Sequence, residues 1–404
     1  MDIFNNLQSL SQNFNKPISL KGECEDIELF QNVPVLVLQR MAKLHSEHNE
    51  INDIRVYIDS AMNPKFKNDI LCSPPSSKEN LKEWAMRMSD GKEILLVMNT
   101  VERWDEQIAR FFANRFKSID PCVDNQLVHI EITYFIGNSK YTPFGVHIDE
   151  FSDALHFNLG PTDRAMYLWE PELYEKSKGS LASSYNPESI FEMGQRHEIK
   201  QGYWFFLPAS SYYHIGVNTG FSISLAIAFI RYDKQKLLER ALRMKVSDYC
   251  QESCLKEDRI TNLVQETSKQ SGIVQSQSYC KEIISVNEAI EEYVLRIRSN
   301  GGFRVPPMKN KSICKEWKKK IIHLVKPFKL LVLVDERIRI FARGSMLSCR
   351  RNDNIIRLIE QINSGEEIYV PHLIQEYSSH LNEDVLYTLL EYLLVNRAIE
   401  EVTV

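Results

Sequence analysis

Two side chains near the middle of the sequence have the types and the spacing of metal ligands. His147 and Asp149 stand two positions apart in the run YTPFGVHIDEF, which begins at residue 141. In an extended strand such side chains point to the same face, so both could enter one cavity. A second histidine would complete a set of two imidazoles and one carboxylate, which binds an octahedral metal ion on one side and leaves three positions open. His214, in the later strand-like run GYWFFLPASSYYHIG, is the candidate for this third ligand.

The same His-x-acid spacing occurs at three other places: His45/Glu47, His48/Glu50 and His129/Glu131. The first two pairs overlap in the polar run HSEHNE, which lacks the alternation of a strand and indicates a solvated helix or turn. The third pair lies in LVHIEITYF, which does alternate, and we favour a polar strand face over a ligand role there.

The pair His147/Asp149 is preferred because of the residues around it. A Pro-Phe-Gly turn precedes the pair, and two strand-like runs follow at 154–159 and 165–169, separated by a Gly-Pro turn. His197 competes with His214 for the third position, but no comparable strand pattern follows it.

Short runs rich in β-branched and aromatic residues, separated by Gly, Pro, Asn and Ser, extend from residue 126 to 229. This pattern predicts a double-stranded β-helix, or jelly roll, whose interior can hold a small ligand. The segment before it predicts mixed structure, with helices over 30–45 and 104–116 and strands over 52–60 and 93–101.

The rest of the chain changes in character. Helical periodicity over 236–245 and 287–298 indicates a connector, and the final part predicts a hairpin, three helices and a short terminal strand, an arrangement that resembles a winged helix. We therefore divide the chain into a barrel domain with its N-terminal segment at 1–232, a helical connector at 233–305 and a winged-helix-like domain at 306–404.

Residues 141–229 together resemble the JmjC-type branch of the cupin superfamily, the iron(II)- and 2-oxoglutarate-dependent oxygenases, and most of all its ribosomal-oxygenase-like members. The features that match are His147-x-Asp149, a turn followed by Arg164 at the start of the next strand, the run WFFLPA before His214, and the strand SISL after it.

This resemblance implies that His147, Asp149 and His214 bind iron(II) and that Arg164 pairs with the far carboxylate of 2-oxoglutarate. A guanidinium is well suited to bind a carboxylate through two hydrogen bonds. The implied reaction is hydroxylation, with molecular oxygen, of a side chain in a ribosomal protein or in a ribosomally synthesised precursor peptide. A homodimer formed through the connector is also implied. The alternative is a non-catalytic cupin that senses a ligand and binds a partner through its C-terminal module; the complete triad favours the enzyme.

Other polar residues could face the same pocket. His156 and Asn158 share one face of a strand by period 2, and Tyr134 and Ser224 are placed as pocket hydroxyls. We expect Asn158, Ser224 and Tyr134 to help hold 2-oxoglutarate, with a core position as the alternative reading of such strand residues.

The composition is that of an ordinary soluble protein, with 43% hydrophobic and 25% charged residues and a net charge of -5. The N-terminus lacks the pattern of a signal peptide, and no apolar run approaches the roughly 20 residues of a membrane helix, so we expect a cytoplasmic protein. The eight cysteines are dispersed, and Cys250 and Cys254 have no second pair of ligands nearby, which indicates reduced thiols.

The charges of the C-terminal part bear on its partners. The predicted recognition helix, 382–395, contains no Lys or Arg and carries three acidic residues, which would repel phosphate, so DNA is disfavoured as a partner. The basic run KNKSICKEWKKK at 309–320 is interpreted as a solvated face in preference to a docking surface for an acidic partner.

Overall fold

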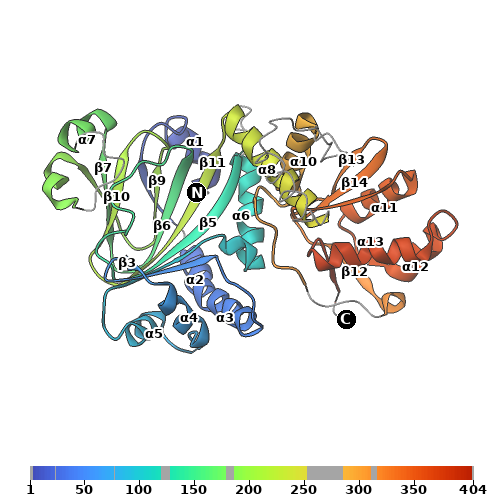
Figure 1. The fold of residues 1–404 in the computed structure, drawn as a ribbon, viewed down its shortest axis with the longest axis horizontal. Helices are drawn as coiled ribbons and strands as arrows, with labels where there is room; N and C mark the ends of the chain where they lie inside the picture. The colour runs from blue at the N-terminus through green and yellow to red at the C-terminus, as the bar shows by residue number, and fades with distance from the viewer. Residues whose placement is uncertain are drawn as a thin grey trace, which may run out of the picture.

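The computed structural model describes residues 3–22, 24–76, 78–119, 128–178, 186–252, 285–310 and 316–402. Its elements form a mixed fold in which helices surround a large antiparallel sheet, as the sequence predicts. Strand β10 (Tyr213–Asn218), which carries His214, lies toward one end of the molecule and the C-terminal unit lies at the other, with α6 (Glu106–Ile119) and α8 (Lys234–Glu252) between them (Figure 1).

The large sheet has eight strands among the described residues, and every neighbouring pair in it is antiparallel. Its spatial order is β1 (Ile18–Lys21), β9 (Tyr203–Leu207), β6 (Ser152–Pro161), β11 (Ser222–Arg231), β5 (Val128–Gly137), β4 (Ile94–Met98), β2 (Ile54–Ile58) and β3 (Ala61–Met62). Strands β2, β3 and β4 of the N-terminal segment thus extend one side of the sheet, β1 of the same segment forms its other edge, and the strands between them come from the predicted barrel.

The two faces of this sheet differ because side chains alternate along each strand. On β5, Ile130, Ile132, Tyr134 and Ile136 belong to the main core, and the neighbouring strands add apolar residues such as Leu155 and Leu225 to the same face. The opposite face carries small residues at Ala154, Ala226 and Ala228, which leave space for a cavity.

Helices of the N-terminal segment cover the apolar face. They are α1 (Ile3–Leu10), α2 (Cys24–Gln31), α3 (Val33–Ser46), α4 (Pro64–Cys72), α5 (Leu81–Met88) and α6 (Glu106–Ile119). The helix predicted over 30–45 corresponds mainly to α3, which starts at Val33 with Pro34 in its first turn, while the first predicted residues belong to the end of α2 at Gln31. Helix α6 begins after Asp105, whose Oδ1 accepts a hydrogen bond from the Ile108 amide at 3.0 Å.

A second sheet of three described strands faces the large one. Its order is β10 (Tyr213–Asn218), β7 (Arg164–Trp169) and β8 (Gln195–Ile199), all antiparallel. Met166 and Leu168 on its inner face pack with Phe205 and Leu207 of the large sheet. The outer face is covered by α7 (Pro171–Lys178) and the 3-10 helix η3 (Glu188–Met193), where aromatic residues such as Trp169 stack.

The connector contains α8 (Lys234–Glu252) and α10 (Val286–Ser299), which pack on each other and include the two helices that the periodicity predicts. The Ser285 hydroxyl accepts a hydrogen bond from the Glu288 amide and caps α10. Residues 253–284, which include Cys254 and the polar run at 271–278, lie outside the described ranges.

The C-terminal unit has its own core and two small antiparallel sheets. Its elements are η4 (Trp317–Lys319), β12 (Ile321–Leu324), β13 (Leu331–Val334), β14 (Arg337–Ala342), β15 (Ser345–Arg350), α11 (Asp353–Asn363), β16 (Ile368–Tyr369), α12 (Val370–Tyr377), α13 (Glu383–Val395) and β17 (Ile399–Glu401). The predicted hairpin, three helices and terminal strand are present, whereas β12, β15 and β16 were not predicted. The winged-helix assignment and the three-part division of the chain stay predictions.

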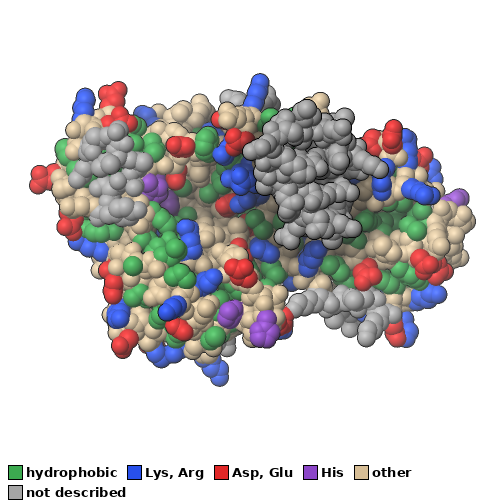
Figure 2. Space-filling view, in the orientation of Figure 1, with side chains coloured by type: hydrophobic (Ala, Val, Ile, Leu, Met, Phe, Trp, Pro, Cys, Tyr) green, Lys and Arg blue, Asp and Glu red, His purple; other side chains and the backbone are tan. Residues whose placement is uncertain are grey.

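The basic run at 309–320 lies partly outside the described ranges, and three of its described lysines have acidic partners. Lys318, Lys319 and Lys320 form ion pairs with Glu383, Glu316 and Glu401 respectively. On the face shown in Figure 2, basic and acidic side chains are interspersed over the described surface. This arrangement fits a solvated face.

No helix among the described residues is both long enough and apolar enough to span a membrane.

Candidate metal centre and its cavity

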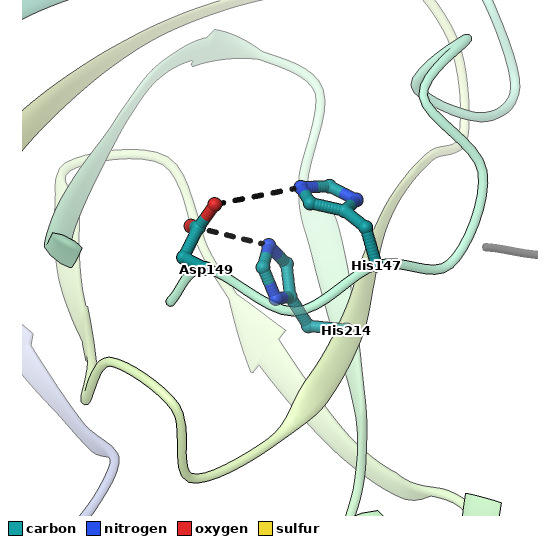
Figure 3. Close-up of side chains that lie close together, drawn as sticks. All are labelled: His147, Asp149 and His214. Carbon is teal, nitrogen blue, oxygen red and sulfur yellow. Dashed lines mark ion pairs between the residues drawn. The ribbon is translucent and has the colours of Figure 1, made fainter. Parts of the chain in front are cut away.

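His147, Asp149 and His214 come together at one site, with one ligand atom from each within 4.8 Å of the others (Figure 3). Asp149 faces both imidazoles: His147 Nε2 lies 3.9 Å from Asp149 Oδ1 and His214 Nε2 lies 3.8 Å from Asp149 Oδ2. The centroids of the two imidazole rings are 4.3 Å apart. Within the described residues, this is the one group of three His, Cys, Asp or Glu side chains that could hold a metal ion.

The backbone fixes the two histidines relative to each other. The His147 amide donates to the His214 carbonyl at 3.2 Å, and the His214 amide donates to the His147 carbonyl at 2.8 Å, so the two residues form a β-bridge. His147 Nδ1 lies 3.0 Å from the Gly145 carbonyl, which suits a donor there and leaves Nε2 free to bind a metal. The Asp149 carbonyl accepts from the Ser210 amide at 2.8 Å.

The protonation of these groups fits a cation. Burial lowers the pKa of His214 well below its ordinary value, so this imidazole is neutral and can donate a lone pair. Burial also raises the pKa of Asp149, although the nearby His147 opposes the shift. No Lys or Arg within the described residues forms an ion pair with Asp149, so a bound metal would supply its missing countercharge.

The triad lies in the wall of a cavity of about 290 Å³ between the two sheets. The large sheet contributes Thr133, Phe135, Ala154, His156, Ala226 and Ala228 to this cavity, and the three-stranded sheet contributes Arg164, Met166, His214 and Gly216. A cavity of this size can enclose a small organic ligand.

Arg164 is a buried cation that faces this cavity, with only 6% of its surface exposed. Its Nε donates to Asn218 Oδ1 at 2.6 Å, and its Nη1 donates to the Ser224 hydroxyl. Burial lowers its pKa to about 10, so the guanidinium stays charged at neutral pH. No carboxylate of the described residues lies within ion-pair distance of it. A buried charge without a partner is costly, which makes this position suited to an anionic ligand.

The side chain of Thr142, which carries a hydroxyl group, lies close to Arg164. A side chain at Gly216 would start 3.0 Å from Arg164 Nη2 and 3.8 Å from Thr142 Cγ2, so the glycine keeps this space open. Thr142 Oγ1 is buried, lines the cavity and has no hydrogen-bond partner among the described residues. The sequence analysis did not select Thr142, because it lies in a turn with no strand periodicity.

His156 lines the cavity as the strand periodicity suggests. Burial, with the nearby positive charge of Arg164, lowers its pKa to about 3, so this imidazole is neutral. Its Nε2 is buried without a hydrogen-bond partner in the described part of the chain.

Three expected pocket residues have other roles. The prediction for Tyr134 was wrong: it points into the main core, where its hydroxyl donates to the Phe30 carbonyl at 3.1 Å. The prediction for Asn158 was also wrong, because its side-chain amide bonds to Gly160, Thr162 and Ile199 and holds the turn after β6.

Ser224 is buried and contacts Arg164 with its hydroxyl, so its place is behind the guanidinium and not in the cavity wall. His197 also lies outside the cavity, against Phe205, which removes it as a competitor for the third ligand position.

His129 and Glu131 lie on β5 beyond the cavity. His129 is fully buried against Tyr232, and Glu131 forms an ion pair with Arg304 from the segment after α10. In the described residues no third ligand-type side chain joins them, so the pair does not form a metal site.

The N-terminal segment also supplies two polar cavity residues that the sequence analysis missed. Arg55 of β2 and Asn99, which follows β4, both line the cavity. They reach it because β5 pairs with β4 and β4 pairs with β2. The sequence signal that could have identified Arg55 is its charge in the otherwise apolar run IRVYI.

No protein family and no curated protein matches the chain. Among solved structures, one of Escherichia coli YcfD has 12% sequence identity and a TM-score of 0.48, with coverage of 100% of this chain and 98% of that chain. The chain is similar to a ribosomal oxygenase. YcfD bears that description in a structure with cobalt and succinic acid (10% identity, TM-score 0.43, 96% of each chain) and in one with cobalt and 2-oxoglutarate (12%, 0.43, 98% of each chain).

Proposed function

We propose that this chain is an iron(II)- and 2-oxoglutarate-dependent oxygenase of the JmjC type, which hydroxylates a side chain of a peptide or protein. One observation carries the proposal: the same cavity contains a His-Asp-His triad and a buried arginine without a carboxylate partner in the described residues. A divalent metal and a dianion such as 2-oxoglutarate would satisfy both groups at once.

The residues have distinct roles in binding. His147, Asp149 and His214 would hold the metal, and Arg164 would receive the far carboxylate of 2-oxoglutarate with the Thr142 hydroxyl as a second donor. Bound iron and 2-oxoglutarate supply the oxidation of the substrate C–H bond by molecular oxygen, with succinate and carbon dioxide as the other products.

The other residues of the cavity limit the access of water to the reacting groups. Phe135, Phe144, Met166 and the alanines of β11 line it with apolar surface, which limits the number of waters near the reacting groups. The Ser224 and Asn218 side chains orient the Arg164 guanidinium from behind, so it is in place before the co-substrate arrives.

The substrate belongs to the class that the resemblance implies, a ribosomal protein or a ribosomally synthesised precursor peptide. Support comes from the C-terminal unit, whose helix α13 starts with Glu383 and Asp384 and contains no Lys or Arg. A winged-helix-like module with such a helix suits binding of a peptide or packing in a homodimer better than binding of DNA. A cytoplasmic location fits both substrates.

The test is an anaerobic titration of iron(II) and 2-oxoglutarate into the full-length protein, followed by the weak visible charge-transfer band of the complex. We expect the band in the wild type and in Arg196→Gln, whose arginine is an exposed residue of β8 outside the cavity. His147→Ala should show no band, and Arg164→Ala should need much more 2-oxoglutarate. A folded wild type without a band would contradict the proposal and favour a ligand-sensing cupin.

A further inference from the structure

A second arginine in the cavity wall has no role in the reaction as described. Arg55 comes from β2 of the large sheet, whereas Arg164 comes from β7 of the opposite sheet, so the two cations belong to different walls. Arg55 Nη2 donates to Asn99 Oδ1 at 3.3 Å. Its Nε is buried and has no hydrogen-bond partner among the described residues, none of which offers it a carboxylate within ion-pair distance.

Phe144 separates Arg55 from the metal centre. The Arg55 guanidinium lies 5.3 Å from the centroid of the Phe144 ring, and that ring lies 6.0 Å from the His147 imidazole, edge to face. The aromatic ring thus holds the guanidinium in the wall and offers an apolar surface for the methylene groups of a bound side chain.

The charges of the cavity lining decide what kind of side chain it accepts. Asp149 is the one carboxylate among the described lining residues, and it belongs to the metal site. Glu131, which pairs across the sheet with the lining residue Ala228, is bonded to Arg304 at 2.8 Å. Once Arg164 is paired with the co-substrate, a Lys or Arg side chain that entered the cavity would meet the charge of Arg55 and no available carboxylate of the lining, which disfavours its burial.

We propose that Arg55 and Asn99 form the subsite for the substrate side chain, and that this side chain carries a carboxylate or a carboxamide. This inference rests on the proposed function and names the substrate class of the same site. A Glu or Gln side chain offers the acceptor oxygen that Arg55 lacks, and its methylenes lie against Phe144 and Phe135. Arg164 remains the partner of the co-substrate, and Arg55 binds the substrate.

The experiment uses full-length protein loaded with zinc(II) and 2-oxoglutarate, because zinc is redox-inert and prevents turnover. The probes are acetylated, amidated peptides Gly-Gly-Xaa-Gly-Gly with Glu, Gln, Lys or Arg at the centre, and their dissociation constants are measured by saturation-transfer NMR. We expect the wild type to bind the Glu and Gln peptides about tenfold more tightly than the Lys and Arg peptides. Arg55→Gln should abolish this preference, and Arg55→Glu should reverse it.

Two controls make the result specific. Arg196→Gln should bind the peptides as the wild type does, and Arg55→Gln should keep the wild-type thermal midpoint and the wild-type affinity for 2-oxoglutarate in the iron titration. Equal or tighter binding of the Lys and Arg peptides to the wild type would overturn the inference, and so would an unchanged preference in Arg55→Gln. A loss of 2-oxoglutarate affinity in Arg55→Gln would place Arg55 at the co-substrate instead.

The proposed function and this inference can fail separately. A charge-transfer band in the wild type without the expected peptide preference overturns only the assignment of Arg55. A protein that shows no band with iron and 2-oxoglutarate overturns both.

Discussion

Two arginines that join the C-terminal unit to the preceding chain face carboxylates, and the two arginines of the cavity do not. At the interface, Arg343 is paired with Glu106, and Arg339 is paired with Glu292. In the cavity, Arg164 has only an amide oxygen and a hydroxyl, and Arg55 has one long bond to Asn99. The paired arginines belong to contacts that hold the molecule together.

The difference follows from the cost of removing a charge from water. A buried cation that meets a carboxylate inside the same chain recovers much of its lost hydration, whereas one without such a partner stays destabilising until a ligand arrives. The unpaired arginines of the cavity therefore lower the stability of the free protein and favour the binding of an anion. The paired arginines of the interface stabilise the fold instead. The predictions below separate these two uses of arginine.

The largest effect on stability is expected for Arg343→Gln. Arg343 is 1% exposed, donates to Glu106 at 2.7 Å and to Asn300 at 3.2 Å, and stacks on Phe328. Its loss leaves these partners unmatched and should lower the free energy of unfolding by about 3 kcal/mol. Urea denaturation followed by circular dichroism measures this change. Arg196→Gln should change it by less than about 0.5 kcal/mol, and a similar value for both variants would contradict the comparison.

Arg164→Gln should act on binding and spare stability. The affinity for 2-oxoglutarate should fall about a hundredfold, equivalent to about 2.7 kcal/mol, because the charged donor to the far carboxylate is lost. The ligand-free variant should unfold at the same urea concentration as the wild type or a higher one, since an uncompensated buried charge has been removed. If Arg164→Gln destabilised the fold as much as Arg343→Gln and left the affinity for 2-oxoglutarate unchanged, the proposed difference between the two groups of arginines would be wrong.

The Glu131–Arg304 pair predicts a pH dependence of stability. Burial by itself would raise the pKa of Glu131, but the nearby His129 and Arg304, with the hydrogen bonds that Arg304 donates, outweigh it and hold the pKa at about 2. A carboxylate with a lowered pKa stabilises the fold above its unfolded pKa, which is about 4.5, and this contribution is lost as the pH falls from there toward about 2.

Glu131→Gln tests this dependence. With a discount for partial exposure, the variant should lose about 2 kcal/mol of unfolding free energy near pH 7 and clearly less near pH 3, measured by urea denaturation. A difference between variant and wild type that is constant over this range would show that the charge of Glu131 is not responsible.

The smallest effect is expected for Tyr134→Phe. Its hydroxyl donates to the Phe30 carbonyl in the core, so the variant should lose about 1 kcal/mol of stability and keep the affinity for 2-oxoglutarate. A weaker affinity for 2-oxoglutarate without a change in stability would indicate that Tyr134 faces the cavity.

Residue types, their spacing and the turns around them singled out His147, Asp149 and His214, and the resemblance to the oxygenase family added Arg164. His147 and Asp149 do come together with His214, but not on a strand: they lie between β5 and β6, where His147 forms only an isolated bridge, and Arg164 opens β7 directly after the turn. The prediction for Tyr134 was wrong by one position: Thr133 and Phe135 line the cavity, and Tyr134 between them faces the core.

Other errors had causes that no local pattern reveals. Asn158 shares the face of His156, but the register between β6 and β11 shifts next to it, and the turn takes up its amide group. Arg55 and Asn99 reach the cavity through pairing of strands that are distant in sequence, which one sequence alone does not specify.

The bridge between His147 and His214 has an evolutionary consequence. The distance between these imidazoles is fixed by paired backbone groups and not by the length of chain that separates them. That chain includes α7 and η3, which cover the outer face of the three-stranded sheet. Insertions and deletions there can reshape the exterior of the protein over generations while the geometry of the metal ligands is inherited unchanged.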